Sequence, residues 1–169
     1  MIKNVYLDTS VIGGCYDKEF EEYSNKLIKE IIDGEKIAVI SDLTRQEILP
    51  APEKVRSKLQ EIDDSKNVIN VFLDSESEKL AYSYISNKVL GKIHIVDAQH
   101  IAIATINKVD VLASWNFKQI VQLDKIKMFN GVNLKEGYSL IEIRNPREVV
   151  KSWKKNLIAS NIWESNAIN

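Results

Sequence analysis

The chain alternates short, almost continuously apolar segments with longer amphipathic ones, and no other feature constrains its fold as strongly. The apolar segments have the length of strands, and they span residues 2–7, 37–40, 68–73, 109–114 and 138–143. Strands without a polar face are typical of a parallel sheet that helices cover on both sides. We therefore predict an α/β fold, a three-layer α/β/α sandwich with a mostly parallel central sheet.

The longer segments predict helices. Within residues 19–33, apolar side chains recur at helical spacing, and Gly34 follows as a stop signal. Gly13 and Gly14 follow the first predicted strand, and we interpret them as a plain turn. Further helices are expected over residues 54–62, over residues 75–90, from Asp97 onward and over residues 147–158.

Length and composition limit the class of protein. A chain of 169 residues has the size of one domain, which we place at residues 1–145, with residues 146–169 as a C-terminal helical tail. The longest apolar runs are too short to span a membrane, and we expect no signal peptide. Cys15 is the single cysteine, so an internal disulfide is excluded and a cytoplasmic location is expected.

The formal net charge of −1 argues against a protein that coats nucleic acid without specificity. It does not exclude an enzyme that cuts nucleic acid, because such an enzyme needs only a local basic strip. The most basic stretch, residues 144–155, could follow an RNA backbone, although a solvated helix face is slightly favoured. An apolar face of the tail, with Trp153, Ile162 and Trp163, could pack on the domain or meet another chain, and we predict a homodimer.

Acidic and amide side chains follow the predicted strands. Asp8 ends the first strand, and Glu47 lies in the helix after the second. Asp97 begins a helix, and Asn116 follows the fourth strand. The carboxyl ends of parallel strands meet at one edge of a sheet, where ligands bind. Clustered carboxylates repel one another without a cation, and Mg²⁺ and Mn²⁺ prefer such oxygen ligands. We therefore predict a metal site at this edge.

Four motifs occur in a characteristic order: LDTSV at residues 7–11, Glu47, DAQHIA at residues 97–102 and SWNF at residues 114–117. Together they resemble a PIN domain over roughly residues 2–145, a family that includes toxin ribonucleases of the VapC type. The resemblance implies a parallel sheet flanked by helices, dependence on Mg²⁺ or Mn²⁺, and hydrolysis of RNA.

The resemblance also assigns roles to particular residues. Asp8, Glu47 and Asp97 match the three principal acidic residues of the family, and all three are expected to be catalytic and to bind metal. Asn116 falls where many members have a fourth Asp, although some carry SWNF as this chain does. An Asn can still bind metal through its oxygen or hold a metal-bound water, with one negative charge fewer. We therefore include Asn116 among the catalytic and metal-binding residues.

Neighbouring residues each allow two interpretations. Thr9 and Ser10 could bond Asp8 or a phosphate, or could cap the turn that follows, with equal weight. For His100 we favour a place on the helix surface over a role as proton donor at the site. For Trp115 we favour packing against a helix over stacking on a base.

The predicted function is that of a divalent-metal-dependent endoribonuclease, the toxin of a type II toxin–antitoxin pair, with RNA as substrate and an antitoxin protein as partner. A bound Mg²⁺ or Mn²⁺ would activate water for in-line attack on phosphorus. One alternative is a non-cleaving PIN-like domain that binds RNA or a protein, which weak metal binding at Asn116 would favour. Another is a receiver-type or small-hydrolase domain. It is disfavoured because a receiver needs paired acids after its first strand and a Lys after a later strand.

Overall fold

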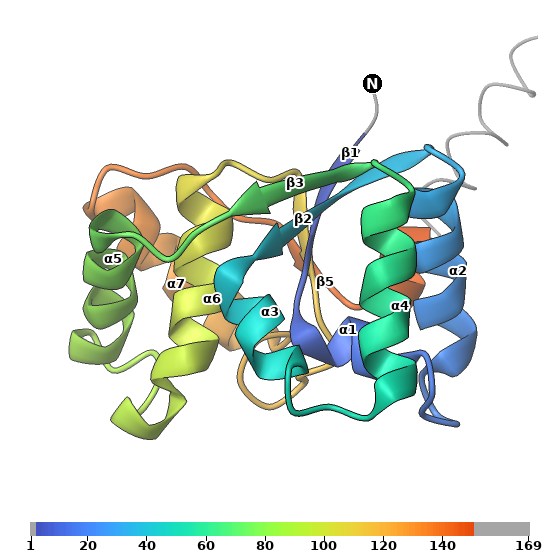
Figure 1. Ribbon diagram of the computed structural model, residues 1–169. Coiled ribbons are helices and arrows are strands. Elements are labelled where there is room, and N and C mark those ends of the chain that lie inside the picture. The colour runs from blue at the N-terminus through green and yellow to red at the C-terminus, as the bar shows by residue number, and fades with distance from the viewer. Residues whose placement is uncertain (1–2, 151–169) are drawn as a thin grey trace, which may run out of the picture.

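The computed structural model of the chain describes residues 3–150 and is built around a parallel sheet (Figure 1). The strand order is β3-β2-β1-β4-β5, and every neighbouring pair is parallel. The strands are β1 (Lys3–Leu7), β2 (Lys36–Ser41), β3 (Val68–Val71), β4 (Val111–Ala113) and β5 (Ile143–Arg144). The predicted α/β class and parallel sheet are therefore confirmed.

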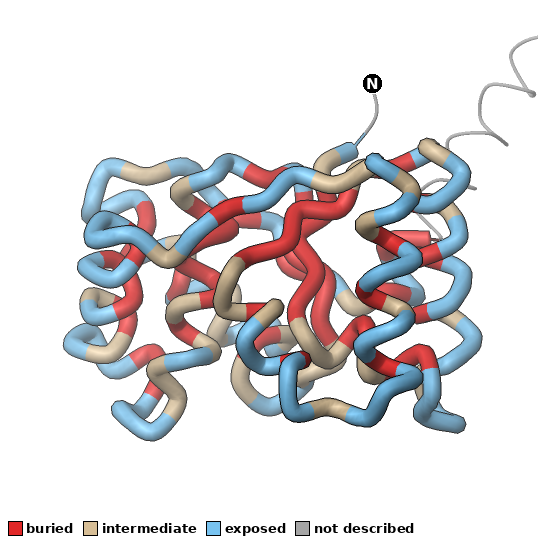
Figure 2. Tube along the Cα trace, viewed as in Figure 1, coloured by how far each residue is buried: buried red, intermediate tan, exposed pale blue. Residues whose placement is uncertain are grey.

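The centre of the sheet is inaccessible to water because β1 has neighbours on both sides. Val5 lies opposite Ala38 of β2 and Val111 of β4. Figure 2 shows these middle strands as a continuous buried band between the helices. The predicted sheet core has the following exposed fractions: Val5 0%, Leu7 0%, Val39 2%, Ile40 0%, Val111 5% and Leu112 0%. The predicted burial of the sheet core is thereby confirmed.

Helices cover both faces of the sheet (Figure 1). One layer contains α1 (Thr9–Gly14), α2 (Glu21–Ile32) and α4 (Glu53–Asp64), and its core includes the β1 side chains of Val5 and Leu7. The other contains α5 (Ser75–Ser86), α6 (Ile95–Ile106) and α7 (Leu123–Lys135), and its core includes Tyr6. Two short helices, α3 (Asp42–Ile48) and η1 (Lys92–His94), complete the described elements.

Three local predictions differ from the structure. Gly13 and Gly14 do not form a plain turn but belong to α1, where Gly14 allows a close approach of Trp115. Helix α7 was not predicted, because Asn130, Gly131 and Asn133 weaken its helical pattern. The last predicted strand is reduced to β5, which has two residues.

The C-terminal segment is described only in part. Residues 146–150 are helical, as predicted from Pro146, and Val149 and Val150 are buried in the layer that contains α2 and α4. Residues 151–158 of the predicted helix, residues 151–155 of the basic stretch, and the predicted dimer contacts at Trp153, Ile162 and Trp163 lie outside the described residues. Within residues 3–150, no helix has both the length and the apolar character needed to cross a membrane.

Candidate active site

The four predicted site residues lie at one edge of the sheet. Asp8 directly follows β1, and Asn116 lies in the loop after β4. Glu47 lies on α3, and Asp97 lies in the first turn of α6. Because β2, β1 and β4 are neighbouring parallel strands, the segments that follow them leave the sheet at the same edge. Hydrogen bonds connect Asp8, Asn116 and Asp97 through Ser114, and His100 lies between Asp8 and Glu47.

Asp8 is buried, with 6% of its surface exposed. Its Oδ2 atom accepts hydrogen bonds from the hydroxyls of Ser10 at 2.5 Å and Ser114 at 2.8 Å. Its Oδ1 atom accepts no hydrogen bond from any residue in the range 3–150 and lies 3.7 Å from Nε2 of His100. Although Asp8 precedes α1, its side chain does not cap that helix. The carboxylate is thus held through one oxygen while the other remains available to a ligand.

The two serine hydroxyls also fix the loop after β4. The Ser10 hydroxyl accepts a hydrogen bond from the backbone N–H of Trp115 at 2.9 Å. The Ser114 hydroxyl accepts one from the backbone N–H of Asn116 at 3.0 Å. Of the two interpretations of Ser10, the structure has the bond to Asp8. The position of Asn116 relative to Asp8 is therefore set by short, buried contacts.

His100 lies beneath the site and is 1% exposed, so its interpretation as a surface residue is wrong. Its Nε2 atom is 2.7 Å from Oε2 of Glu47, and its Nδ1 atom is hydrogen-bonded to the Tyr6 hydroxyl at 2.7 Å. Thr9 donates a second hydrogen bond to the same Glu47 oxygen at 2.6 Å. His100 therefore joins a buried tyrosine of β1 to the acidic residue on α3.

The pKa values at this edge are shifted by burial and by neighbouring charges. Burial lowers the pKa of His100, but the hydrogen bond to Glu47 and the charge of Asp8 outweigh it, so the pKa is raised overall. Burial raises the pKa of Glu47, but hydrogen bonds from His100 and Thr9 outweigh it and lower the pKa overall. Burial and then repulsion from Asp8 raise the pKa of Asp97. The raised pKa favours the protonated form of His100, which would offset part of the negative charge of the site.

Asn116 and Asp97 form a direct pair. The Asn116 side-chain amide donates a hydrogen bond to Oδ1 of Asp97 at 3.0 Å. The Asn116 side-chain oxygen accepts one from the backbone N–H of Gln119 at 3.0 Å. The other Asp97 oxygen lies 3.2 Å from Nδ1 of His94. In this arrangement the Asn116 amide group is a hydrogen-bond donor to Asp97. Its oxygen accepts a hydrogen bond within the turn that follows Asn116.

The side chains at this edge can be compared with the ligands that the predicted Mg²⁺ or Mn²⁺ would need. Within the described chain, no group of three or more His, Cys, Asp or Glu side chains is arranged to hold a metal ion. Each carboxylate instead has donors from the protein: hydroxyls for Asp8, Thr9 and His100 for Glu47, and Asn116 for Asp97. The ligand chemistry nevertheless fits a hard cation, because all three acids offer oxygen and Oδ1 of Asp8 is open.

The residues that sequence reasoning missed here are Tyr6 and His100. The signal for His100 is that α6 is apolar on almost all sides, since Ala98 and every residue from 100 to 105 are buried. A polar residue inside such a segment must be buried with a partner. Tyr6 gave no comparable signal, because a tyrosine in a buried strand is ordinarily a core residue.

The fold of this chain, a parallel five-stranded sheet between two helical layers, is PIN-like. The sequence matches no protein-family model and no curated protein sequence. Solved structures do match. A chain of Rickettsia felis VapBC2, bound to a DNA fragment from its promoter, has a TM-score of 0.52 at 14% identity, over 84% of this chain and 98% of that one.

Two further structures have the same fold. A chain of DNA-bound VapBC from Salmonella typhimurium has a TM-score of 0.51 at 14% identity, over 86% of this chain and 99% of that one. Mycobacterium tuberculosis VapC20, a toxin that cleaves the sarcin–ricin loop, has a TM-score of 0.51 at 14% identity, over 68% of this chain and 91% of that one. At this identity the likeness concerns the fold.

Proposed function

We propose that the protein is a divalent-metal-dependent endoribonuclease and the toxin of a type II toxin–antitoxin pair. The observation that carries the proposal is the meeting of Asp8, Glu47, Asp97 and Asn116 at one sheet edge, although they come from four separate segments. VapC20, which shares the fold, is a toxin that cleaves RNA, and this supports the same class of activity.

In the proposed mechanism, Mg²⁺ or Mn²⁺ would be held by Asp8, Asp97 and Glu47. When bound, the ion would lower the pKa of a water molecule and stabilise charge on the scissile phosphate. The protein's own residues supply the positioning. Ser10 and Ser114 orient Asp8 so that Oδ1 is presented, and His100 holds Glu47 beside it.

Asn116 has a positioning role in this proposal. Its amide already donates to Asp97, so it fixes the orientation of that carboxylate without adding a negative charge. A water bound in the site could be held by the same amide. This keeps Asn116 within the catalytic set, and its oxygen, which accepts one hydrogen bond from Gln119, has a second lone pair for a metal.

The test is a cleavage assay on single-stranded RNA with Mn²⁺, comparing the wild type with Asp8→Asn. A matched control is Asp64→Asn at the end of α4, whose exposed carboxylate accepts from Gln60. We expect Asp8→Asn to lose cleavage, to keep its fold, and to be slightly more stable because one repelling charge is gone. Asp64→Asn should cut as the wild type does. Equal cleavage by Asp8→Asn and the wild type would refute the mechanism.

Two partners belong to this proposal. An antitoxin protein is supported by the two VapBC complexes that share the fold. A small upstream gene for a DNA-binding protein would support it, and co-purification of the two products would test it. A homodimer in the cytoplasm is also proposed. A monomer by light scattering at about tens of micromolar would count against the dimer.

A second candidate function is a PIN-like domain that binds RNA or protein without cutting. It is favoured by one observation, that the carboxylates have internal proton donors and that the Asn116 oxygen is already used. Calorimetric titration with Mn²⁺ separates the two candidates. Saturable binding that Asp8→Asn abolishes supports the nuclease, and no binding at millimolar Mn²⁺ supports the non-cleaving domain.

A further inference from the structure

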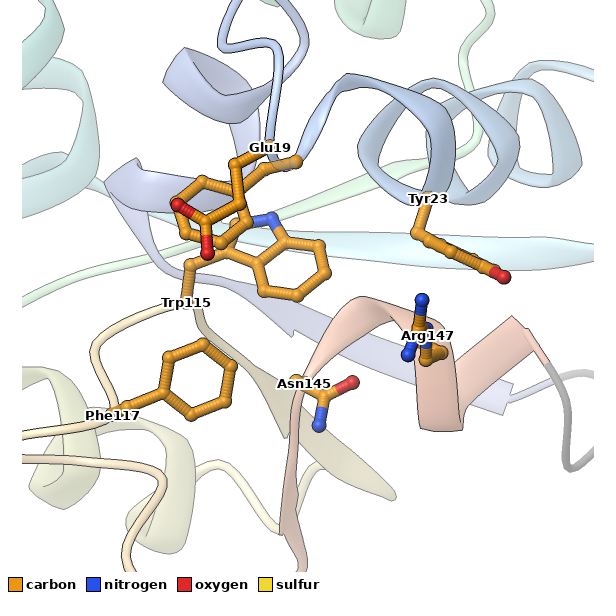
Figure 3. A pocket seen from close by; sticks show the side chains of 7 residues that line it. Glu19, Tyr23, Trp115, Phe117, Asn145 and Arg147 are labelled. Atoms are coloured by element: carbon orange, nitrogen blue, oxygen red, sulfur yellow. The ribbon is translucent and has the colours of Figure 1, made fainter.

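A cavity of about 350 Å³ lies next to the acidic site and is lined by side chains that the proposed chemistry does not use. It falls in the size range of small-molecule pockets, about 300–1,000 Å³. Figure 3 shows aromatic rings on its floor and sides. The lining residues are Glu19, Phe20, Tyr23, Trp115, Phe117, Asn145 and Arg147.

The floor of the cavity is Trp115, and its position is fixed. Its ring stacks on Phe20, with centroids 4.5 Å apart and planes at 21°. Its Nε1–H donates to the Ser24 hydroxyl at 2.9 Å. A Cβ atom on Gly14 would come within 3.0 Å of the indole, so the glycine is needed for this approach. The predicted packing of Trp115 is confirmed, and the ring is also held in one orientation at the floor of the cavity.

The cavity is joined to the acidic site through one hydroxyl. The Trp115 backbone N–H donates to Ser10, and the Ser10 hydroxyl donates to Asp8. Phe117, on the other side of Asn116, is 47% exposed, and its ring centroid lies 6.0 Å from that of Trp115. A strand whose phosphate lies at Asp8 would therefore have aromatic rings within reach of a neighbouring base.

Charged groups lie on opposite sides of the cavity. Figure 3 shows Glu19 on the side of Phe117, and Arg147 on the side of Tyr23. The Arg147 guanidinium lies over the Tyr23 ring, 4.8 Å from its centroid, and forms no salt bridge with a described residue. The Glu19 carboxylate accepts no hydrogen bond from a described residue. The Asn145 side chain, in contrast, is committed to Glu148.

We propose that this cavity binds one unstacked base of the RNA strand, and that it prefers guanine. Phe117 and Trp115 would stack on the base, which is how single-stranded RNA is commonly read. Glu19 would accept hydrogen bonds from the base edge, and Arg147 would face an adjacent phosphate. This rests on the proposed function, because the strand must pass the acidic site.

The preference for guanine follows from the chemistry of a carboxylate. An ionised Glu is an acceptor with two oxygens and has no proton to donate. Guanine presents two adjacent N–H donors on its pairing edge. Adenine and cytosine present one donor beside an acceptor nitrogen, and uracil presents one donor between two carbonyl oxygens. Only guanine matches both oxygens of Glu19 without placing an acceptor against the negative charge.

The experiment measures binding without cleavage. Fluorescence anisotropy in EDTA would compare labelled six-residue oligouridylates that contain a single G or a single A, using the full chain. We expect the G-containing strand to bind more tightly. Phe117→Ala should weaken its binding about 5- to 150-fold, the range for removal of a base-stacking aromatic. Tyr82→Ala, which removes an exposed aromatic ring on α5, should leave binding unchanged.

A second pair of variants tests whether Glu19 recognises the base edge. Glu19→Gln should bring the affinities for the two strands to within about twofold, whereas Glu21→Gln, nearby on α2, should keep the difference. Equal binding of both strands by the wild type would overturn the preference. Equal binding by Phe117→Ala and Tyr82→Ala would overturn the base site itself.

The outcome is distinguishable from failure of the proposed nuclease activity. If the wild type binds the G-containing strand through Phe117 but does not cut RNA with Mn²⁺, the cavity assignment stands and the nuclease proposal fails. If it cuts RNA and Phe117→Ala binds RNA normally, the assignment fails and the nuclease proposal stands. Should Phe117→Ala bind RNA normally but lose a co-purifying antitoxin, the cavity belongs to a protein partner and the base site is refuted.

Discussion

Replacing Gly14 by alanine should destabilise the protein, whereas the same change at neighbouring Gly13 should stabilise it. Both glycines lie in α1, and an alanine there gains about 0.5–1 kcal/mol of helix stability relative to glycine. A Cβ on Gly13 meets nothing within 4 Å. A Cβ on Gly14 would lie 2.7 Å from the Ser24 hydroxyl and 3.0 Å from two atoms of the Trp115 ring.

The magnitude at Gly14 follows from what must move. Overpacking in a core costs about 1–3 kcal/mol, and losing the hydrogen bond from Trp115 to Ser24 costs about 0.5–1.5 kcal/mol more. After the helix gain is subtracted, we expect a net loss of about 0.5–4 kcal/mol at Gly14. Urea unfolding, followed by circular dichroism, would measure both variants. A Gly14→Ala protein as stable as Gly13→Ala would refute this account of the packing under Trp115.

Three other predictions concern the site and the core. Asn116→Asp should lower the melting temperature in EDTA, because the hydrogen bond to Asp97 becomes a repulsion, and should enlarge the stabilisation by Mn²⁺. Differential scanning calorimetry would measure both effects, and an unchanged melting temperature and Mn²⁺ response would contradict the prediction. His100→Leu should cost about 1–3 kcal/mol in urea unfolding, because Glu47 loses its buried donor, and an unchanged midpoint would argue against this role. Burial raises the pKa of the Cys15 thiol to about 11. The neutral thiol therefore contributes stability at pH values below the pKa that Cys15 has in the unfolded chain, and this stability is lost as pH rises through the folded pKa. Between about pH 8 and about pH 10, the wild type should lose about 1 kcal/mol more than Cys15→Ala, and parallel pH profiles would refute this.

The sheet was predictable from the sequence because its signal is local. Each central strand contains an unbroken apolar run, and alternation of such runs with amphipathic segments is typical of a parallel sheet covered on both faces. The position of Asp8 follows from the same signal, since it is the first charged residue after β1. Helix α7 was missed because its buried residues Phe129, Val132 and Asn133 do not form a continuous apolar stripe. Its formation depends on contacts made by the rest of the chain, such as the bond from Tyr84 to Asn133.

The meeting of the four candidate residues was predictable from the sequence, but the contacts between them were not. Parallel topology places Asp8, Glu47, Asp97 and Asn116 at one edge whatever their rotamers are. Which donor faces which carboxylate depends on the distances between segments, and no single segment contains that information. His100 illustrates this, because its burial requires a hydroxyl from β1 and a carboxylate from α3.

The connections change how metal binding at this edge should be understood. Three carboxylates at one edge would repel one another if they faced open space. Here Glu47 has a hydrogen-bonding partner in His100, and a neutral amide stands at position 116 beside Asp97. A cation can bind Oδ1 of Asp8 without breaking a hydrogen bond, whereas binding that displaces one of the other hydrogen bonds loses about 1.5–3 kcal/mol when one partner is charged. Since about 1.4 kcal/mol corresponds to a factor of ten in affinity, losing even one such bond would weaken metal binding at least tenfold. The internal donors therefore let the fold persist without metal and make metal affinity the quantity on which any cleavage depends.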